Sequence, residues 1–119
     1  MYNEIDLWDT FPILARSEKA KESLIESFGK EKGLSAFKQL GKKSRSEEWN
    51  TLLDGHFYDL ISNESKVVGE DSREGSFGEY PIYINEYEGV FWVSAPEFDD
   101  NGYFLCKEDA QKFIDLNWF

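Results

Sequence analysis

The sequence has only one cysteine, Cys106, and one histidine, His56. A single cysteine cannot form an internal disulfide, and these two residues cannot supply the Cys/His cluster of a zinc site. No serine stands in the G-x-S-x-G pattern of a nucleophile elbow, and no glycine-rich loop has the spacing of a phosphate-binding motif. We therefore expect a protein without catalytic activity and without a cofactor or metal.

Long hydrophobic runs are also missing. No apolar run approaches the roughly 20 residues that a membrane-spanning helix needs. The first residues, MYNEIDLWDT, lack the basic start and the apolar stretch of a signal peptide. Together with the unpaired cysteine, these features predict a cytoplasmic protein that does not associate with membranes.

Basic residues are few in the second half of the chain. The whole sequence has 24 acidic and 13 basic residues, which gives a net charge of -11. Residues 1–60 hold 11 acids and 9 bases, whereas residues 61–119 hold 13 acids and 4 bases. A surface of this kind repels nucleic-acid phosphates and attracts basic proteins. We expect a basic protein partner and no direct binding of nucleic acid.

The composition is that of one globular domain over residues 1–119, because 40% of the residues are apolar and 17% are aromatic. The texture changes along the chain: a helical part over about 10–62, an acidic loop over about 63–79, and a β-meander with a helix over about 80–117. The predicted class is α+β, with N-terminal helices packed on a small antiparallel sheet of three or more strands and a C-terminal helix.

Three helices are predicted in the first part. One begins behind Asp9 or Thr10, with Pro12 in its first turn, and ends at Gly29; a short one covers about 34–40. The stretches KEKG, at 30–33, and GKKSRS, at 41–46, are expected to be solvated connections. The third helix begins at Ser46 and presents one apolar face from Trp49 to Ile61.

Alternating apolar residues predict a hairpin in the second part. Its strands cover about 80–85 and 90–95, and the turn is Tyr-Glu-Gly at 87–89. Pro81 cannot donate to a ladder, so its strand should have a free side there or begin there. A third strand is expected at 102–106 and a closing helix at about 107–116, with Ala110, Phe113 and Ile114 facing inward.

The stretch EFDDNGYFLCKE, at 97–108, matches a calcium-binding loop except for Glu97 at its first position. An EF-hand also requires a helix that enters the loop, and here the preceding segment GVFWVSAP has the pattern of a strand. We therefore interpret 97–101 as a turn and Glu108 as an acid in the first turn of the last helix.

The only histidine, the only cysteine and the paired carboxylates can each be explained without a catalytic role. His56 falls on the third helix, where a histidine is typically a surface residue or a satisfied interfacial one. Cys106 follows three apolar residues, so we expect a buried and inert thiol. Carboxylate pairs such as Glu86 with Glu88 could perform acid and base chemistry, but a chain of this size leaves little depth for a substrate cleft.

The acidic half then remains as the candidate binding surface, with carboxylates that steer a basic partner and aromatic residues that supply contact area. The predicted contact residues are Glu70, Asp71, Glu74, Glu79, Glu86, Tyr87, Glu88, Glu97, Phe98, Asp99 and Asp100.

The last part of the chain, EGVFWVSAPEFDDNGYFLCKEDAQKFI, resembles the immunity proteins of bacterial toxin systems, including those of contact-dependent growth inhibition. The resemblance implies a protein that neutralises one cognate toxin, commonly a basic nuclease, by covering its active site or an exosite. Two alternatives stay open: a DNA mimic such as an antirestriction or anti-CRISPR protein, and a small calcium-binding protein or carboxylate-dependent enzyme.

Overall fold

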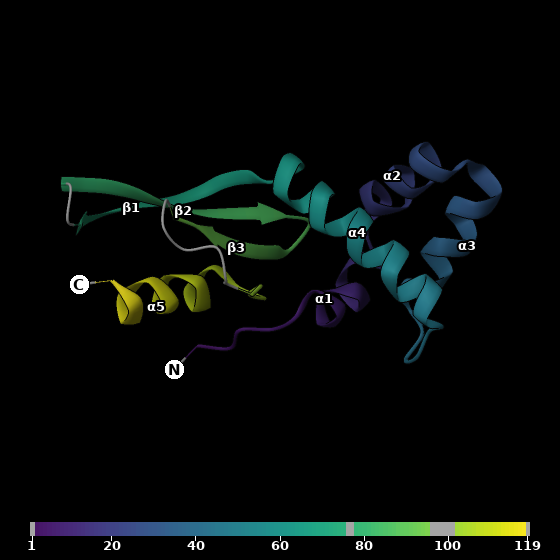
Figure 1. Ribbon diagram of the computed structural model, residues 1–119, viewed down its shortest axis with the longest axis horizontal. Coiled ribbons are helices and arrows are strands. Elements are labelled where there is room, and N and C mark those ends of the chain that lie inside the picture. Colours follow the sequence, from purple (N-terminus) through teal and green to yellow (C-terminus); the bar gives the residue numbers. More distant parts are fainter. Residues whose placement is uncertain (1, 76–77, 96–101, 119) are drawn as a thin grey trace. The chain divides into compact units, whose positions relative to one another are not determined.

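The computed structural model describes residues 2–75, 78–95 and 102–118. These residues form five helices and one three-stranded antiparallel sheet, with four helices before the sheet and one after it (Figure 1). The predicted α+β class is confirmed. Contacts divide the chain into a helical unit, Leu7–Asn63, and a sheet unit, formed by Met1–Asp6 with Glu64–Phe119. The border lies close to the change of texture near residue 62.

The first predicted helix is in fact two helices, α1 (Leu7–Leu14) and α2 (Glu18–Phe28). Ser17 separates them, because its backbone is extended and its Oγ accepts a hydrogen bond from the Ala20 N–H at 3.1 Å. Pro12 lies inside α1 rather than in a first turn, so that prediction was also wrong. Most of the predicted segment is helical, but its pattern did not reveal the cap at Ser17 that interrupts it.

Helix α3 (Lys30–Leu40) begins four residues earlier than predicted and includes KEKG. Gly29 explains the difference: its φ of 87° ends α2, and α3 starts at the next residue. Gly33 is buried where α3 approaches α2, and a Cβ atom there would lie 2.5 Å from the Ile25 Cα. KEKG is therefore part of a helical hairpin, and the prediction of a solvated connection was wrong.

Helix α4 (Glu47–Glu64) begins as predicted, since the Ser46 Oγ accepts a hydrogen bond from the Trp49 N–H at 3.3 Å. Its buried face contains Leu53, Phe57 and Ile61, each four residues from the next. Trp49 is only partly buried. The segment 41–46 is the connection that the sequence predicted.

The sheet has the order β1-β2-β3, with β1 (Lys66–Gly75), β2 (Gly78–Tyr87) and β3 (Val90–Ser94). The predicted hairpin is confirmed as β2 and β3. Its two-residue turn has positive φ at both Glu88 and Gly89, 47° and 87°, as the right-handed twist of a hairpin favours. The pairing of β2 with β3 ends at Tyr83 opposite Ser94, so Pro81 lies beyond the end of β3. At Pro81, β2 therefore has no paired strand on the β3 side.

The acidic loop predicted over about 63–79 is largely a strand, and this is the main correction. Strand β1 pairs with β2 from Lys66 opposite Glu86 to Gly75 opposite Gly78, with one bulge between Val67 and Gly69. Figure 1 shows β1 and β2 continuing together past the end of β3. β1 has little apolar content because it is an edge strand, and its pairing with the β-prone strand β2 holds it in place.

The third strand predicted at 102–106 is reduced to two isolated bridges. Phe104 exchanges backbone hydrogen bonds with Phe91 of β3, at 2.8 and 2.9 Å, and Tyr103 does so with Ile5. The bridge to Phe104 covers the outer edge of β3 at Phe91.

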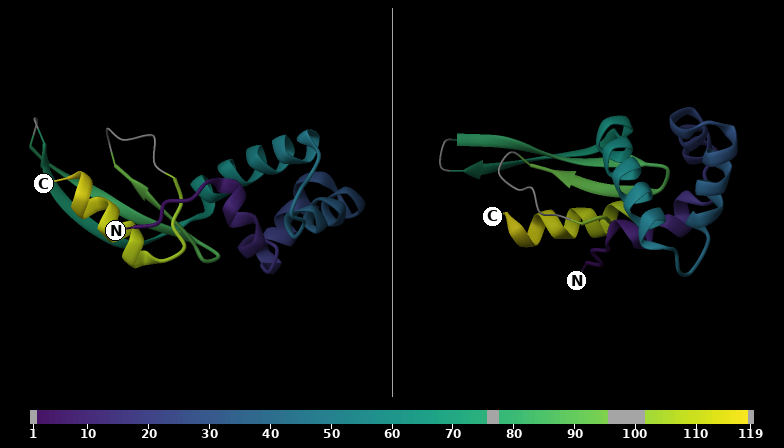
Figure 2. Two further views of the ribbon diagram at one scale, coloured as in Figure 1. Left: turned by 90° about the horizontal axis from the view of Figure 1, so that it is seen from below. Right: turned by 45° about the vertical axis from the view of Figure 1, so that its right-hand side comes forward.

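Helix α5 (Lys107–Asn117) confirms the predicted closing helix and lies along one face of the sheet (Figures 1 and 2). Ala110, Phe113 and Ile114 face inward as predicted. They form the core of the sheet unit with Ile82, Ile84, Val93 and Phe104. Even-numbered residues of β2 therefore face α5, and odd-numbered residues point to the opposite face.

Candidate protein-binding surface

Three predicted contact residues lie together on the face of the β1–β2 hairpin that points away from α5. Glu74 of β1 is directly opposite Glu79 of β2, and Glu70 of β1 is opposite Tyr83. Directly opposed residues in an antiparallel pair share a face, and alternate residues along each strand return to it. Glu70, Glu74 and Glu79 are all exposed. We call these three side chains, with the partly buried Tyr83 beside them, the carboxylate face.

Among the described residues, no ion pair joins Glu70, Glu74 or Glu79 to a basic side chain, and Arg73 pairs instead with Asp71 and Asp115. Side chains directly opposite in a sheet have Cβ atoms about 5 Å apart, and like charges at that separation destabilise the pair. The Glu74–Glu79 pair therefore costs the hairpin stability. A cationic partner would relieve this repulsion.

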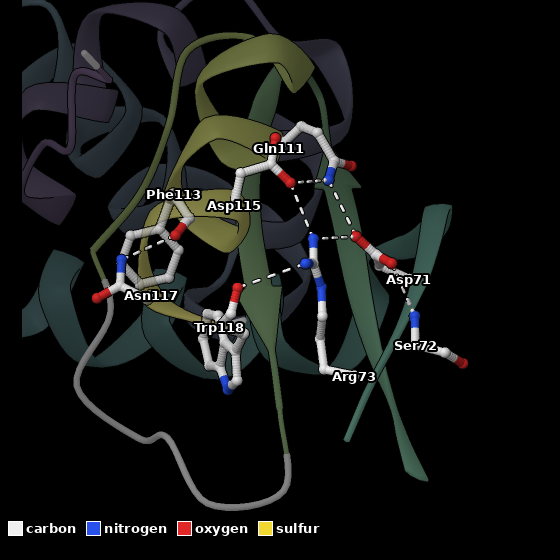
Figure 3. Close-up of polar contacts among 8 residues, drawn as sticks. All are labelled: Asp71, Ser72, Arg73, Gln111, Phe113, Asp115, Asn117 and Trp118. Atoms are coloured by element: carbon white, nitrogen blue, oxygen red, sulfur yellow. Dashed lines mark hydrogen bonds and ion pairs between the residues drawn. The ribbon is translucent and has the colours of Figure 1, made fainter. Parts of the chain in front are cut away.

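Asp71 points to the other face and is already paired with Arg73 (Figure 3). Arg73 Nη2 donates to Asp71 Oδ2 and to Asp115 Oδ1, both at 2.8 Å, and Gln111 Nε2 donates to the same two carboxylates at 3.1 Å. Partial burial raises the pKa of Asp71, but hydrogen bonds from Gln111, Arg73 and the Ser72 N–H, with the charge of Arg73, outweigh it and lower the pKa overall. Asp71 therefore ties β1 to α5.

Tyr87 is buried, with 7% of its surface exposed, so the prediction that its ring supplies contact area is wrong. Burial, helped by the charges of Glu88 and Glu64, raises the pKa of its hydroxyl to about 12. Glu86 and Glu88 are partly exposed, at the turn end of β2 and remote along the strand from Glu79. The predicted acidic set is thus divided between the two ends of β2.

Four other predicted contacts, Glu97, Phe98, Asp99 and Asp100, lie outside the described residues, as does the part of the calcium-like stretch from 97 to 101. Glu108 occupies the first turn of α5 as predicted. Within residues 2–75, 78–95 and 102–118, no three His, Cys, Asp or Glu side chains gather where they could hold a metal ion.

The histidine of this chain contacts a serine, which raises the question of a nucleophile. Ser23 Oγ lies 3.0 Å from His56 Nε2, but its proton is donated to the Ala20 carbonyl at 2.7 Å. His56 Nε2 must then carry a proton and donate to Ser23 Oγ. Burial lowers the pKa of His56 and the charge of Asp59 opposes this shift. A nitrogen that donates cannot accept the serine proton, so this arrangement does not activate Ser23.

Cys106 is exposed at the N-cap position of α5, and the prediction of a buried thiol was wrong. The apolar run before it is explained differently, since Phe104 is fully buried whereas Leu105 is 48% exposed. The bridges at Tyr103 and Phe104 end the strand before it reaches Cys106.

Sequence reasoning missed β1, and with it the arrangement of the carboxylate face and of the Asp71 cluster. One signal was present: Glu70, Ser72 and Glu74 alternate with Asp71 and Arg73. Because residues on both faces of β1 are polar here, the alternation of apolar and polar residues that predicts a strand is absent.

Among the described residues, no helix has both the length and the apolar content to cross a membrane. Comparison of the chain with protein-family models, with curated proteins and with solved structures finds no match.

Proposed function

We propose that this protein is an acidic inhibitor that binds a basic protein partner and neutralises it, in the manner of an immunity protein against a nuclease-type toxin. The observation that carries the proposal is the carboxylate face, where Glu70, Glu74 and Glu79 are exposed on one side of a hairpin without a described counter-ion. Such a surface steers a basic partner towards the hairpin and pairs with its lysines and arginines on contact.

The spacing of these carboxylates favours this function over a DNA mimic. Glu70 and Glu74 are four residues apart on one strand, which corresponds to about 13 Å. A mimic of the phosphate backbone would need a further negative group between them, but the intervening position on that face is Ser72, which is neutral, and Glu79 lies across from Glu74 rather than between the two. The pattern matches separate salt bridges with a protein better than a continuous row of phosphates.

The test is protection against a basic toxin domain, and a larger protein with such a domain encoded beside this gene is the first candidate. The triple change Glu70→Lys, Glu74→Lys and Glu79→Lys should abolish protection and slow association, while the wild type should associate more slowly as salt is added. The matched control reverses Glu18, Glu22 and Glu26, three exposed acids of α2.

The two variants carry the same net charge, so they separate the location of the charge from its amount. Loss of protection by both variants, or by neither, would refute a role for the carboxylate face. Circular dichroism on both variants checks that the folds remain intact.

A further inference from the structure

The outer edge of β1 is the one long strand edge that the described residues leave uncovered. β1 is terminal in the sheet, and no bridge among residues 2–75, 78–95 and 102–118 pairs with its outer side. The opposite edge is treated differently, because Phe104 pairs with Phe91 of β3 and Tyr103 pairs with Ile5. An exposed edge offers unpaired N–H and C=O groups to another strand.

The Ser72–Pro81 pair shows which backbone groups of β1 face outward. Pro81 has no N–H, and the Ser72 N–H donates to Asp71 Oδ1 at 2.8 Å rather than to β2. This pair is therefore of the type without mutual hydrogen bonds, and such pairs alternate along an antiparallel ladder. It follows that Glu70 and Glu74, two residues to either side, also direct their backbone N–H and C=O groups outward.

Part of this edge is already occupied. Lys107 Nζ donates to the Val68 carbonyl at 2.7 Å, next to the bulge. Asp71 Oδ1 accepts the Ser72 N–H, while its Oδ2 is held by Arg73 and Gln111. The carboxylate of Asp71 thus occupies the position that the carbonyl of an added strand would take. It could release the Ser72 N–H and remain anchored.

The charges decide what could pair here. A second copy of β1, added antiparallel about Ser72, would place Glu70 against Glu74 of the other copy, and like charges directly opposite repel. A strand with lysine or arginine at alternate positions would instead place cations beside Glu70 and Glu74, about 5 Å away.

We propose that an extended basic segment of the partner adds to the edge of β1, with backbone hydrogen bonds to Glu70, Ser72 and Glu74 and with its cationic side chains over the carboxylate face. This inference rests on the proposed function and specifies how the partner is held. Backbone pairing would fix the register, and the carboxylates would select a basic strand.

The test uses an acetylated peptide of alternating lysine and threonine, with a peptide of the same composition in two blocks as control, and measures binding to the full-length protein by NMR titration. Glu74→Gln and Glu79→Gln each remove one charge from the same face. Glu74→Pro and Glu79→Pro remove the same charge together with an N–H. Neither N–H belongs to the β1–β2 ladder, and only that of Glu74 faces the proposed docking edge.

We expect the two glutamine variants to weaken binding to a similar extent. Glu74→Pro should weaken it by a further twofold to tenfold, about the loss expected for one hydrogen bond, and Glu79→Pro should not. If the proline variants unfold, a peptide N-methylated on its bonding edge replaces them and should bind more weakly than one methylated on the other edge.

An equal effect of proline at both positions would overturn pairing at the edge and leave the role of the charges intact. Glutamine variants that bind as well as wild type would instead refute the proposed function. Self-association that Glu74→Pro abolishes would assign the edge to a second copy of the chain, and so would overturn a basic strand as its occupant.

Discussion

Replacing Gly33 with alanine tests the helical unit at its closest contact. Gly33 is buried in α3, and an added Cβ would lie 2.5 Å from the Ile25 Cα, 2.6 Å from the Ile25 nitrogen and 2.8 Å from the Leu24 carbonyl carbon. These are backbone atoms of α2, so no side chain can rotate to make room. The two helices would have to separate.

The magnitude follows from two opposing effects. Overpacking of this kind costs about 1 to 3 kcal/mol, and contact with backbone atoms places the cost near the upper end. Alanine in a helix recovers about 1 kcal/mol relative to glycine. We therefore expect Gly33→Ala to lower the free energy of unfolding by about 2 kcal/mol.

Gly55 provides the matched control. It is exposed within α4, and apart from the backbone of its own helix a Cβ there would have no atom within 4 Å. Gly55→Ala should therefore raise the free energy of unfolding by about 1 kcal/mol. Urea denaturation of both variants, followed by circular dichroism, measures the two changes. Similar changes of one sign in both variants would refute the close approach of α2 and α3.

Four further predictions concern single side chains. Arg73→Met should destabilise the protein at pH 7 and raise the pKa of Asp71, observed by NMR titration; an unchanged pKa would contradict the cluster. The folded pKa of Asp71 lies below its ordinary value of 3.8, so its contribution to stability is complete above pH 3.8 and is lost as the pH falls through the lowered pKa. Denaturation curves measured over a series of pH values should show this loss in the wild type and not in Asp71→Asn. The folded pKa of His56 lies below 6.5, so stability should decline as the pH falls below 6.5 and the unfolded chain takes up the proton first; a decline that persists in His56→Gln would assign it to other groups. Cys106 is exposed, so iodoacetamide should modify it in the native protein at nearly the rate seen in urea, and strong protection would restore the buried thiol that the sequence predicted.

The elements that could be predicted carry a local signal. Ser46 caps α4, and Leu53, Phe57 and Ile61 show the helical repeat. The alternation of apolar and polar residues, together with the glycine in the turn, predicts the hairpin of β2 and β3. Each of these signals lies within a few residues of the element that it specifies, so no knowledge of distant contacts is needed.

The errors share one cause, which is dependence on residues far along the chain. The stretch 30–33 was predicted to be a solvated connection, whereas its Gly33 allows α3 to approach the backbone of α2. β1 appeared to be a loop because its polar residues are stabilised from outside, by pairing with β2 and by the cluster of Arg73 with Asp115 of α5. Cys106 followed an apolar run, yet only Phe104 of that run is fully buried.

The candidate site divides in the same way. The composition alone shows that the chain is acidic and has few basic and few reactive side chains, so these properties could be predicted from the sequence. Which carboxylates lie together was decided by the register of β1 on β2. A strand alternates its faces, so Glu70 and Glu74 point away from α5, while Asp71, one residue from Glu70, points to the face of α5 and pairs with Arg73. Charge is a sum over residues, whereas a binding face depends on pairing between segments that only the folded chain brings together.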